Sequence, residues 1–334
     1  MSGIERESLV LGLDLGGTKI AAALATPEGE IMARGQSPTL AENGRDAVIE
    51  AMFATVESTL AAAQVLSSQL LGIGIAAAGL IDAAAGKLVF SPNLPGWRDV
   101  PLRDAVRDRF LVRTCMGNDA TLAALGEWTF GLKREVANLV YITVSTGIGA
   151  GIIADGRLYG GTGGAAGEVG HMTIDVNGPR CGCGNRGCWE TLASGTALAR
   201  EAAERVREGA RTLITELAGE RNGGIDARVV FEAAEAGDEL ARELISRQGY
   251  YLGVGLANLV NIFSPELVLV GGGVAKMGDL LFQPATEVVR ERAYSTRVNR
   301  AEIRPALLGD DSGVLGAVAY VLDELAAEKQ ATEE

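Results

Sequence analysis

The chain twice places a short apolar run before a glycine-containing turn and a second apolar run. The first copy has expected strands at residues 9–15 and 20–25. The second, about 130 residues later, has expected strands at residues 138–144 and 150–154. A buried strand, a tight turn and a return strand form a hairpin, and apolar strands that alternate with helical segments predict α/β layers. The 334 residues are therefore expected to form two α/β lobes joined by crossing segments.

Three glycine turns each follow an expected buried strand, where exposed backbone N–H groups can bind an anion. The most specific begins at Asp14, which could hold hydrated Mg²⁺, and continues through Gly16, Gly17, Thr18 and Lys19. It is neither a Walker loop nor a dinucleotide fingerprint, because Thr precedes Lys and a strand follows where a helix is required. The other two turns contain Thr146-Gly147 and Gly271-Gly272-Gly273. Each turn could also be an ordinary structural turn.

A cluster of metal-binding residue types occupies residues 171–188, called here the His–Cys loop. His171 is the only histidine, and Cys181, Cys183 and Cys188 are three of the four cysteines. One imidazole and three thiols at short spacing are what a closed tetrahedral zinc site requires, and four protein ligands make its role structural. A disulfide pair or unrelated buried thiols are the alternatives, and Cys115 is expected to be a plain core residue.

Net charge and hydropathy argue against several classes of binding partner and against a membrane-spanning protein. The formal charge of −13 argues against binding to nucleic acid or to an anionic membrane. No signal peptide is visible and no apolar run approaches the length of a membrane span. Because zinc thiolates require a reducing compartment, we expect a cytoplasmic protein.

A further candidate site lies where a buried strand expected at residues 111–116 ends in Gly117-Asn118-Asp119, before a helix expected at 120–130. A carboxylate at a strand end can act as a general base. The plainer role for Asp119 is as the helix N-cap.

Together these motifs resemble the ROK family of sugar kinases and repressors, within the hexokinase–actin superfamily. The resemblance covers nearly the whole chain and rests on Asp14-x-Gly-Gly-Thr18, Asn118-Asp119, Thr146-Gly-Ile-Gly149, Glu168-x2-His171, Cys181-Gly-Cys-Gly-x2-Gly-Cys188 and Glu190. The segment 91–97 adds a likeness to the bacterial glucokinases of that family. Only eight residues precede the first expected strand, so the helix-turn-helix of the family's repressors is not expected.

The resemblance implies a two-lobed, actin-like (hexokinase/ribonuclease H-like) α/β fold with a structural zinc loop, in which sugar and ATP meet in the cleft between the lobes. Residues 1–119 and the C-terminal helix 312–334 would form the smaller, N-terminal lobe. Residues 120–311 would form the larger lobe, with the zinc loop and the nucleotide-binding turns. A homodimer or homotetramer is expected.

The resemblance also implies roles for individual residues. Asp119 would be the general base that accepts the proton of the sugar 6-hydroxyl as it attacks the γ-phosphate of ATP. The sugar would contact Gly79, Asn93, Asn118, Asp119, Glu168, His171 and Glu190. ATP with Mg²⁺ would contact Asp14, Gly16, Gly17, Thr18, Lys19, Thr146, Gly147, Gly271, Gly272 and Gly273. Because the turns are separate from the His–Cys loop in sequence, loss of zinc should weaken sugar binding more than ATP binding.

The activity implied is ATP-dependent phosphorylation of glucose to glucose 6-phosphate and ADP. A kinase for N-acetylmannosamine, N-acetylglucosamine or fructose would use the same constellation, because the motifs do not include the pocket lining that selects the sugar. A sugar-sensing regulator without catalysis is the alternative from another class. The retained Asp119 and the intact turn at residues 14–18 argue against it.

Overall fold

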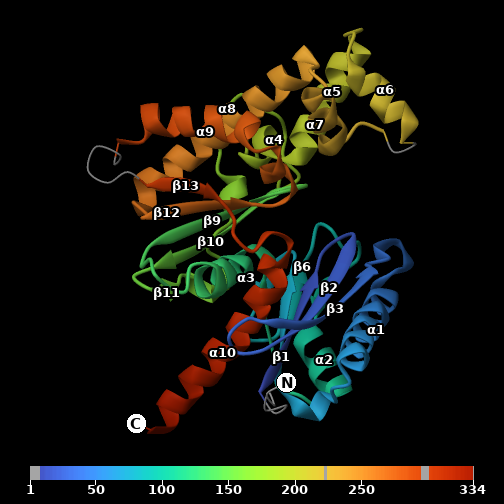
Figure 1. Ribbon diagram of the computed structural model, residues 1–334, viewed down its shortest axis with the longest axis vertical. Coiled ribbons are helices and arrows are strands. Elements are labelled where there is room, and N and C mark those ends of the chain that lie inside the picture. Colours follow the sequence, from blue (N-terminus) through green and yellow to red (C-terminus); the bar gives the residue numbers. More distant parts are fainter. Residues whose placement is uncertain (1–7, 222–223, 295–300, 334) are drawn as a thin grey trace. The chain divides into compact units, whose positions relative to one another are not determined.

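The computed structural model describes residues 8–221, 224–294 and 301–333, and the chain divides into two compact units (Figure 1). The first unit contains residues 1–137, 151–167 and 307–334, and the second contains residues 138–150 and 168–306. No helix within the described residues is long and apolar enough to cross a membrane.

The first unit is built on a five-stranded sheet with the order β3-β2-β1-β4-β8. Its strands are β1 (Leu9–Leu15), β2 (Lys19–Ala25), β3 (Ile31–Pro38), β4 (Leu70–Ala77) and β8 (Thr114–Asn118). The strands β1, β2 and β3 pair antiparallel, whereas β1, β4 and β8 are parallel. A smaller antiparallel sheet contains β5 (Leu80–Asp82), β6 (Lys87–Phe90) and β7 (Arg98–Val100).

Helices cover both faces of the five-stranded sheet. They are α1 (Arg45–Ala63), α2 (Leu102–Phe110), α3 (Asp119–Gly126), which continues as the π-helical turn η3 (Glu127–Gly131), and α10 (Ser312–Glu333). Short 3-10 turns are η1 (Ala41–Asn43), η2 (Ser67–Gln69), η4 (Thr162–Gly164) and η8 (Gly309–Asp311), and the short strand β11 (Arg157–Leu158) also lies in this unit.

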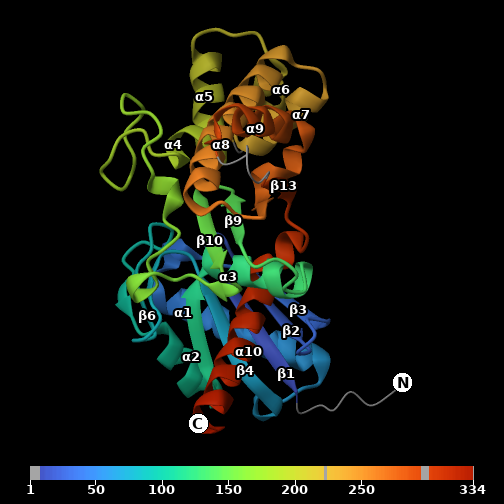
Figure 2. The ribbon, with the colours of Figure 1, turned by 90° about the vertical axis from the view of Figure 1, so that its left-hand side faces the viewer.

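Alternation along β1 sorts its side chains between the two faces. Leu11 and Leu13 belong to the core that includes α1 and α2, whereas Val10 packs with α10. Figure 2 shows α10 alongside β1 and β4. The backbone of α10 can approach strands β1 and β4 closely because Gly12 and Gly74 carry no side chain. A Cβ at these positions would lie 2.0 and 2.1 Å from carbonyl oxygens of α10. The C-terminal helix is thus an integral layer of the first unit.

The second unit is built around β9 (Leu139–Val144), the start of β10 (Ile148–Ala154), β12 (Leu267–Gly271) and β13 (Glu302–Pro305). Strands β9, β12 and β13 are parallel, and the sheet order is β11-β10-β9-β12-β13. Its helices are α4 (Glu190–Ala193), α5 (Gly195–Arg207), α6 (Leu213–Glu220), α7 (Ala227–Glu235), α8 (Glu239–Phe263) and α9 (Asp279–Arg292), with 3-10 turns η5 (Val169–His171) and η6 (Gly273–Met277). The apolar faces of α5, α7, α8 and α9 form one core with the sheet.

The two sheets have matching strand orders, with β1 and β9 in the central position of each. The repeated strand–turn–strand pattern of the sequence is therefore confirmed as a repeated sheet. The strand expected at residues 111–116 is displaced, because Leu111 adopts φ 54° at the end of α2. Strand β8 begins at Thr114 and runs through Asn118, so Asp119 opens α3.

The division into units differs from the sequence-based lobes at residues 120–137, 151–167 and 307–311, which lie in the first unit and make it the larger one. Helix α3 belongs there because it packs tightly on α10, where a Cβ on Gly316 would lie 1.8 Å from the carbonyl oxygen of Leu122. Residues 1–7 and 334 of the expected smaller lobe lie outside the described residues.

Candidate functional site

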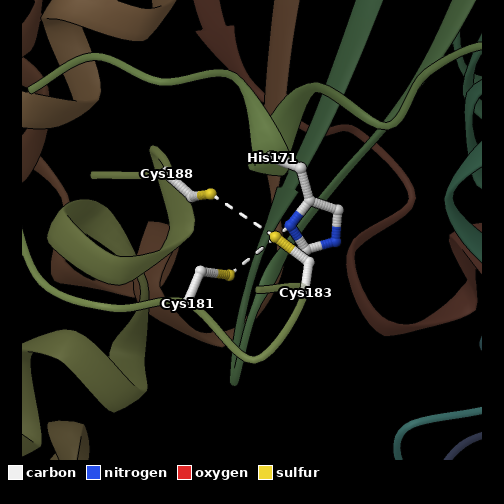
Figure 3. Close-up of side chains that lie close together, drawn as sticks. All are labelled: His171, Cys181, Cys183 and Cys188. Atoms are coloured by element: carbon white, nitrogen blue, oxygen red, sulfur yellow. Dashed lines mark hydrogen bonds between the residues drawn. The ribbon is translucent and has the colours of Figure 1, made fainter. Parts of the chain in front are cut away.

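The four residues of the predicted metal cluster come together in the second unit (Figure 3). One ligand atom from each of His171, Cys181, Cys183 and Cys188 lies within 4.8 Å of all the others. The Sγ atom of Cys181 is 3.7 Å from Nδ1 of His171, and the Sγ atoms of Cys183 and Cys188 are also 3.7 Å apart. All three of these thiols are free, so the disulfide interpretation is wrong.

The spacing of the donor atoms fits a tetrahedral zinc ion. Zinc–sulfur bonds of about 2.3 Å and a zinc–nitrogen bond of about 2.0 Å place neighbouring ligand atoms about 3.5–3.8 Å apart at tetrahedral angles. The Cys181–His171 and Cys183–Cys188 distances match this range, and all four donor atoms lie within 4.8 Å of one another. Burial raises the pKa of the Cys188 thiol to about 12, so a bound ion would have to displace its proton.

Backbone hydrogen bonds hold the His–Cys loop in this shape. The N–H of Cys181 donates to the carbonyl of Asn185, and Thr173 and Cys188 form an antiparallel bridge. Gly187 adopts φ 63°, and a Cβ there would lie 1.5 Å from the carbonyl oxygen of Asp175. The loop therefore requires glycine at this position to bring its two sides together.

The predicted sugar contacts of the second unit adjoin this cluster. Because Nδ1 of His171 faces Cys181, its Nε2 is the ring nitrogen available to other partners, and it lies 4.0 Å from Oε2 of Glu168. Glu190, two residues after Cys188, is the first residue of α4, and its Oε2 accepts the N–H of Ile148 at 3.0 Å. A metal at the cluster would thus fix the positions of all three predicted sugar contacts.

The predicted catalytic residue lies in the first unit, at the carboxyl ends of neighbouring parallel strands. Asn118, not Asp119, is the N-cap of α3, since its side chain accepts the N–H of Thr121 at 3.1 Å. The amide of Asn118 also donates to the carbonyl of Gly79 at 3.1 Å. The capping role proposed for Asp119 is therefore wrong. Its half-buried carboxylate instead accepts hydrogen bonds from the N–H of Ala120 and from the side chain of Asn118.

Two carboxylates at these strand ends have altered proton affinities. Burial raises the pKa of Asp119. Burial and the charge of Asp119 together raise the pKa of Asp14 to about 7, against a smaller opposing effect of Lys19. Such shifts are frequent where carboxylates handle protons or metal ions.

The first glycine turn is a hairpin in which the N–H of Gly16 donates to the carbonyl of Lys19 at 3.0 Å. Thr18 and Lys19 are exposed. The side chain of Asn93 lies against Gly17. A Cβ added to Gly17 would be 2.7 Å from the Cβ of Asn93. A predicted sugar contact and a predicted phosphate contact are thus neighbours in the first unit.

The other two glycine turns lie in the second unit beside a cavity of about 780 Å³. Two of the residues expected to contact nucleotide, Thr146 and Gly273, line this cavity, whereas Gly271 is buried against Tyr141. Their role as nucleotide contacts stays a prediction. Helices contribute further cavity residues that no sequence pattern predicted, including Thr196, Phe231, Lys276 and Met277. The glycine turns at Thr146-Gly147 and Gly271-Gly272-Gly273 were the local sequence signals for this cavity, and Gly273 opens η6.

The chain is similar in sequence and in fold to known proteins. The chain is 38% identical to a glucokinase of Halalkalibacterium halodurans over 92% of each chain. It is 36% identical to a putative xylose repressor of a Caldicellulosiruptor species, over 96% of this chain and 79% of that protein. A crystal structure of a ROK family glucokinase from Streptomyces griseus, in complex with glucose and AMPPNP, matches with a TM-score of 0.84 at 34% identity. That match covers 95% of this chain and 100% of that one. A sequence model of the ROK family matches residues 10–324, and this chain belongs to that family.

Proposed function

We propose that this protein is an ATP-dependent hexose kinase that phosphorylates the 6-hydroxyl of glucose and releases glucose 6-phosphate and ADP. The observation that carries the proposal is the similarity, over 95% of the chain, to a glucokinase structure that holds glucose and AMPPNP. Such a reaction needs carboxylates that accept a proton and hold a metal ion, and it needs a pocket for the nucleotide. The strand ends of the first unit offer the carboxylates, and the second unit offers a cavity.

Asp119 is the proposed general base. Phosphoryl transfer passes through a loose transition state, so orienting the hydroxyl and neutralising charge matter more than strong basicity. The hydrogen bonds of Asn118 to Thr121 and Gly79 fix the segment that presents Asp119. Its raised pKa makes it a better proton acceptor than an ordinary aspartate.

We propose that Asp14 holds Mg²⁺ through water molecules of the hydrated ion. The ion would neutralise charge on the phosphates of ATP. The exposed Thr18 and Lys19 on the same turn would contact phosphate oxygens. The cavity beside Thr146 and Gly273 would hold the nucleoside, with Phe231 and Met277 as apolar surface for the base.

The proposed sugar contacts are Gly79, Asn93, Asn118, Glu168, His171 and Glu190. Carboxylates suit the task because each oxygen accepts hydrogen bonds from sugar hydroxyls. A zinc ion held through Nδ1 of His171 would fix the tautomer in which Nε2 carries the proton and could donate it to a sugar hydroxyl. Zinc itself is proposed to be structural, since its four protein ligands leave no position for substrate.

A sugar-sensing regulator is the second candidate, because the chain is also 36% identical to a putative xylose repressor. The test is ADP release with glucose, mannose, fructose, N-acetylglucosamine and N-acetylmannosamine, with the Asp119→Asn variant as control. Glucose-dependent turnover that the variant lacks supports the kinase. Sugar binding without turnover would favour the regulator, and turnover with an N-acetyl sugar alone would change the substrate.

Three zinc thiolates require a reducing compartment, which favours the cytoplasm. We propose a homodimer or homotetramer, to be measured by light scattering.

A further inference from the structure

The phosphate-side turn of the second unit is hydrogen-bonded to a residue on the sugar side. The N–H of Ile148 donates to Oε2 of Glu190 at 3.0 Å, although 42 residues separate them in the sequence. The contact requires glycine at position 147, because a Cβ there would lie 2.2 Å from the same oxygen. Gly147 therefore has a steric role toward Glu190 beside its proposed role toward phosphate.

Two more hydrogen bonds join the same turn to the start of α5. The N–H of Gly195 donates to the carbonyl of Ser145 at 2.7 Å, and Oγ1 of Thr196 donates to the carbonyl of Thr146 at 2.7 Å. The segment that follows the His–Cys loop is thus attached to residues 145–148 at three points. A displacement of Glu190 has to move the turn, and the reverse also holds.

The second oxygen of the Glu190 carboxylate, Oε1, makes no hydrogen bond with the described part of the chain. A sugar hydroxyl that donates to Oε1 would act on the same carboxylate that orders the turn through Oε2. It would also disperse negative charge close to where ATP phosphates are expected, and so reduce their repulsion. Both effects favour nucleotide binding after sugar binding.

We propose that Glu190 couples the sugar and nucleotide sites, so that each ligand raises the affinity for the other by about tenfold, within the usual range for coupled sites. The proposal rests on the proposed function, which places sugar at Glu190 and ATP phosphates at residues 145–149. It also changes the expectation about zinc. Because Glu190 follows Cys188 closely, loss of the ion should weaken ADP binding as well as sugar binding.

The test compares the zinc-loaded wild type with Gly147→Ala and with a control, Thr146→Ala, which removes an exposed side chain from the same turn. Calorimetry measures the Kd of glucose without nucleotide, and the Kd of ADP with and without saturating glucose. Gly147→Ala should weaken glucose binding about tenfold and abolish the coupling, even though no sugar contact is proposed there. Thr146→Ala should weaken ADP binding and leave glucose binding and the coupling unchanged.

Unchanged glucose binding by a folded, zinc-loaded Gly147→Ala protein overturns the proposal, as does independent binding of the two ligands by the wild type. If Gly147→Ala does not fold, hydrogen exchange on the wild type decides. Glucose alone should slow exchange of the amides at residues 146–149, and unchanged exchange there overturns the coupling. A wild type that binds no hexose overturns the proposed function together with the coupling, whereas hexose turnover without coupling leaves the function intact.

Discussion

Asp14 and Asp119 interact electrostatically at the ends of β1 and β8, and the charge of Asp119 adds to burial in raising the pKa of Asp14 to about 7. Neither strand neighbours the other directly, since β4 lies between them. The parallel register of β1, β4 and β8 nevertheless brings both carboxylates to one edge of the sheet. The first unit therefore gives up some stability at neutral pH to hold two acids where the proposed chemistry needs them.

Asp14→Asn should stabilise the ligand-free protein at pH 8 by roughly 1–4 kcal/mol and abolish kinase activity. The pKa of Asp14 rises from 3.8 to about 7 on folding, so the folded state binds more protons between these values. The stability that this preferential proton binding gives the folded state is fully present below about pH 4 and is lost as the pH rises through about 7. Urea unfolding at pH 5 and pH 8 measures the difference, which should be larger at pH 8. Asp108→Asn, at an exposed ion pair, serves as the control. An equal gain at both pH values would contradict the prediction.

Asp119→Ala should lower kcat by about 10²–10⁴-fold, the usual contribution of a positioned general base, while the KM for glucose changes little. Sugar affinity is retained because the other proposed sugar contacts remain. Steady-state kinetics with a coupled ADP assay measures both parameters. Near-normal turnover would remove Asp119 from the catalytic role.

Cys183→Ser should lose zinc and weaken glucose binding, because one of the four clustered donors is replaced by a poorer ligand. Elemental analysis should find about one zinc per chain in the wild type. Cys115→Ser is the matched control, since Cys115 packs near α10 in the first unit and should leave the metal content unchanged. Tight glucose binding by the metal-free protein would show that zinc does not organise the sugar contacts.

Glu127→Ala should destabilise the protein by about 2–5 kcal/mol, because it leaves buried donors unpaired. The carboxylate of Glu127 is fully buried and accepts the N–H groups of Leu307 and Leu308 and the hydroxyl of Ser312, at 2.6–2.9 Å. Glu127→Gln keeps one acceptor oxygen and should lose less. Urea unfolding compares both with Glu135→Ala at an exposed site, and a loss no larger than that of the control would contradict this assignment.

Features encoded by neighbouring residues could be predicted from the sequence. The glycine turns at Gly16 and Gly147 mark the ends of the strands on either side of them. The four residues of the metal cluster are close enough in sequence for a single loop to bring their side chains together. Features that depend on distant segments could not be predicted. Glu127 finds its partners 180 residues away, and its π-helical turn has no local pattern that marks it. The cavity lining from Thr196 and Phe231 likewise depends on how α5 and α7 pack.

The close fit of α10 against Gly12 and Gly74 has a consequence for synthesis on the ribosome. The first unit combines strands β1 and β4 with helix α10, which follows them by more than 230 residues, so one apolar face of the sheet stays uncovered until residues 312–333 have been synthesised. The second unit contains none of these segments and can form its core earlier. We expect nascent chains that stop before residue 312 to present a sheet face that chaperones bind, and the first unit to become protease-resistant only after α10 emerges.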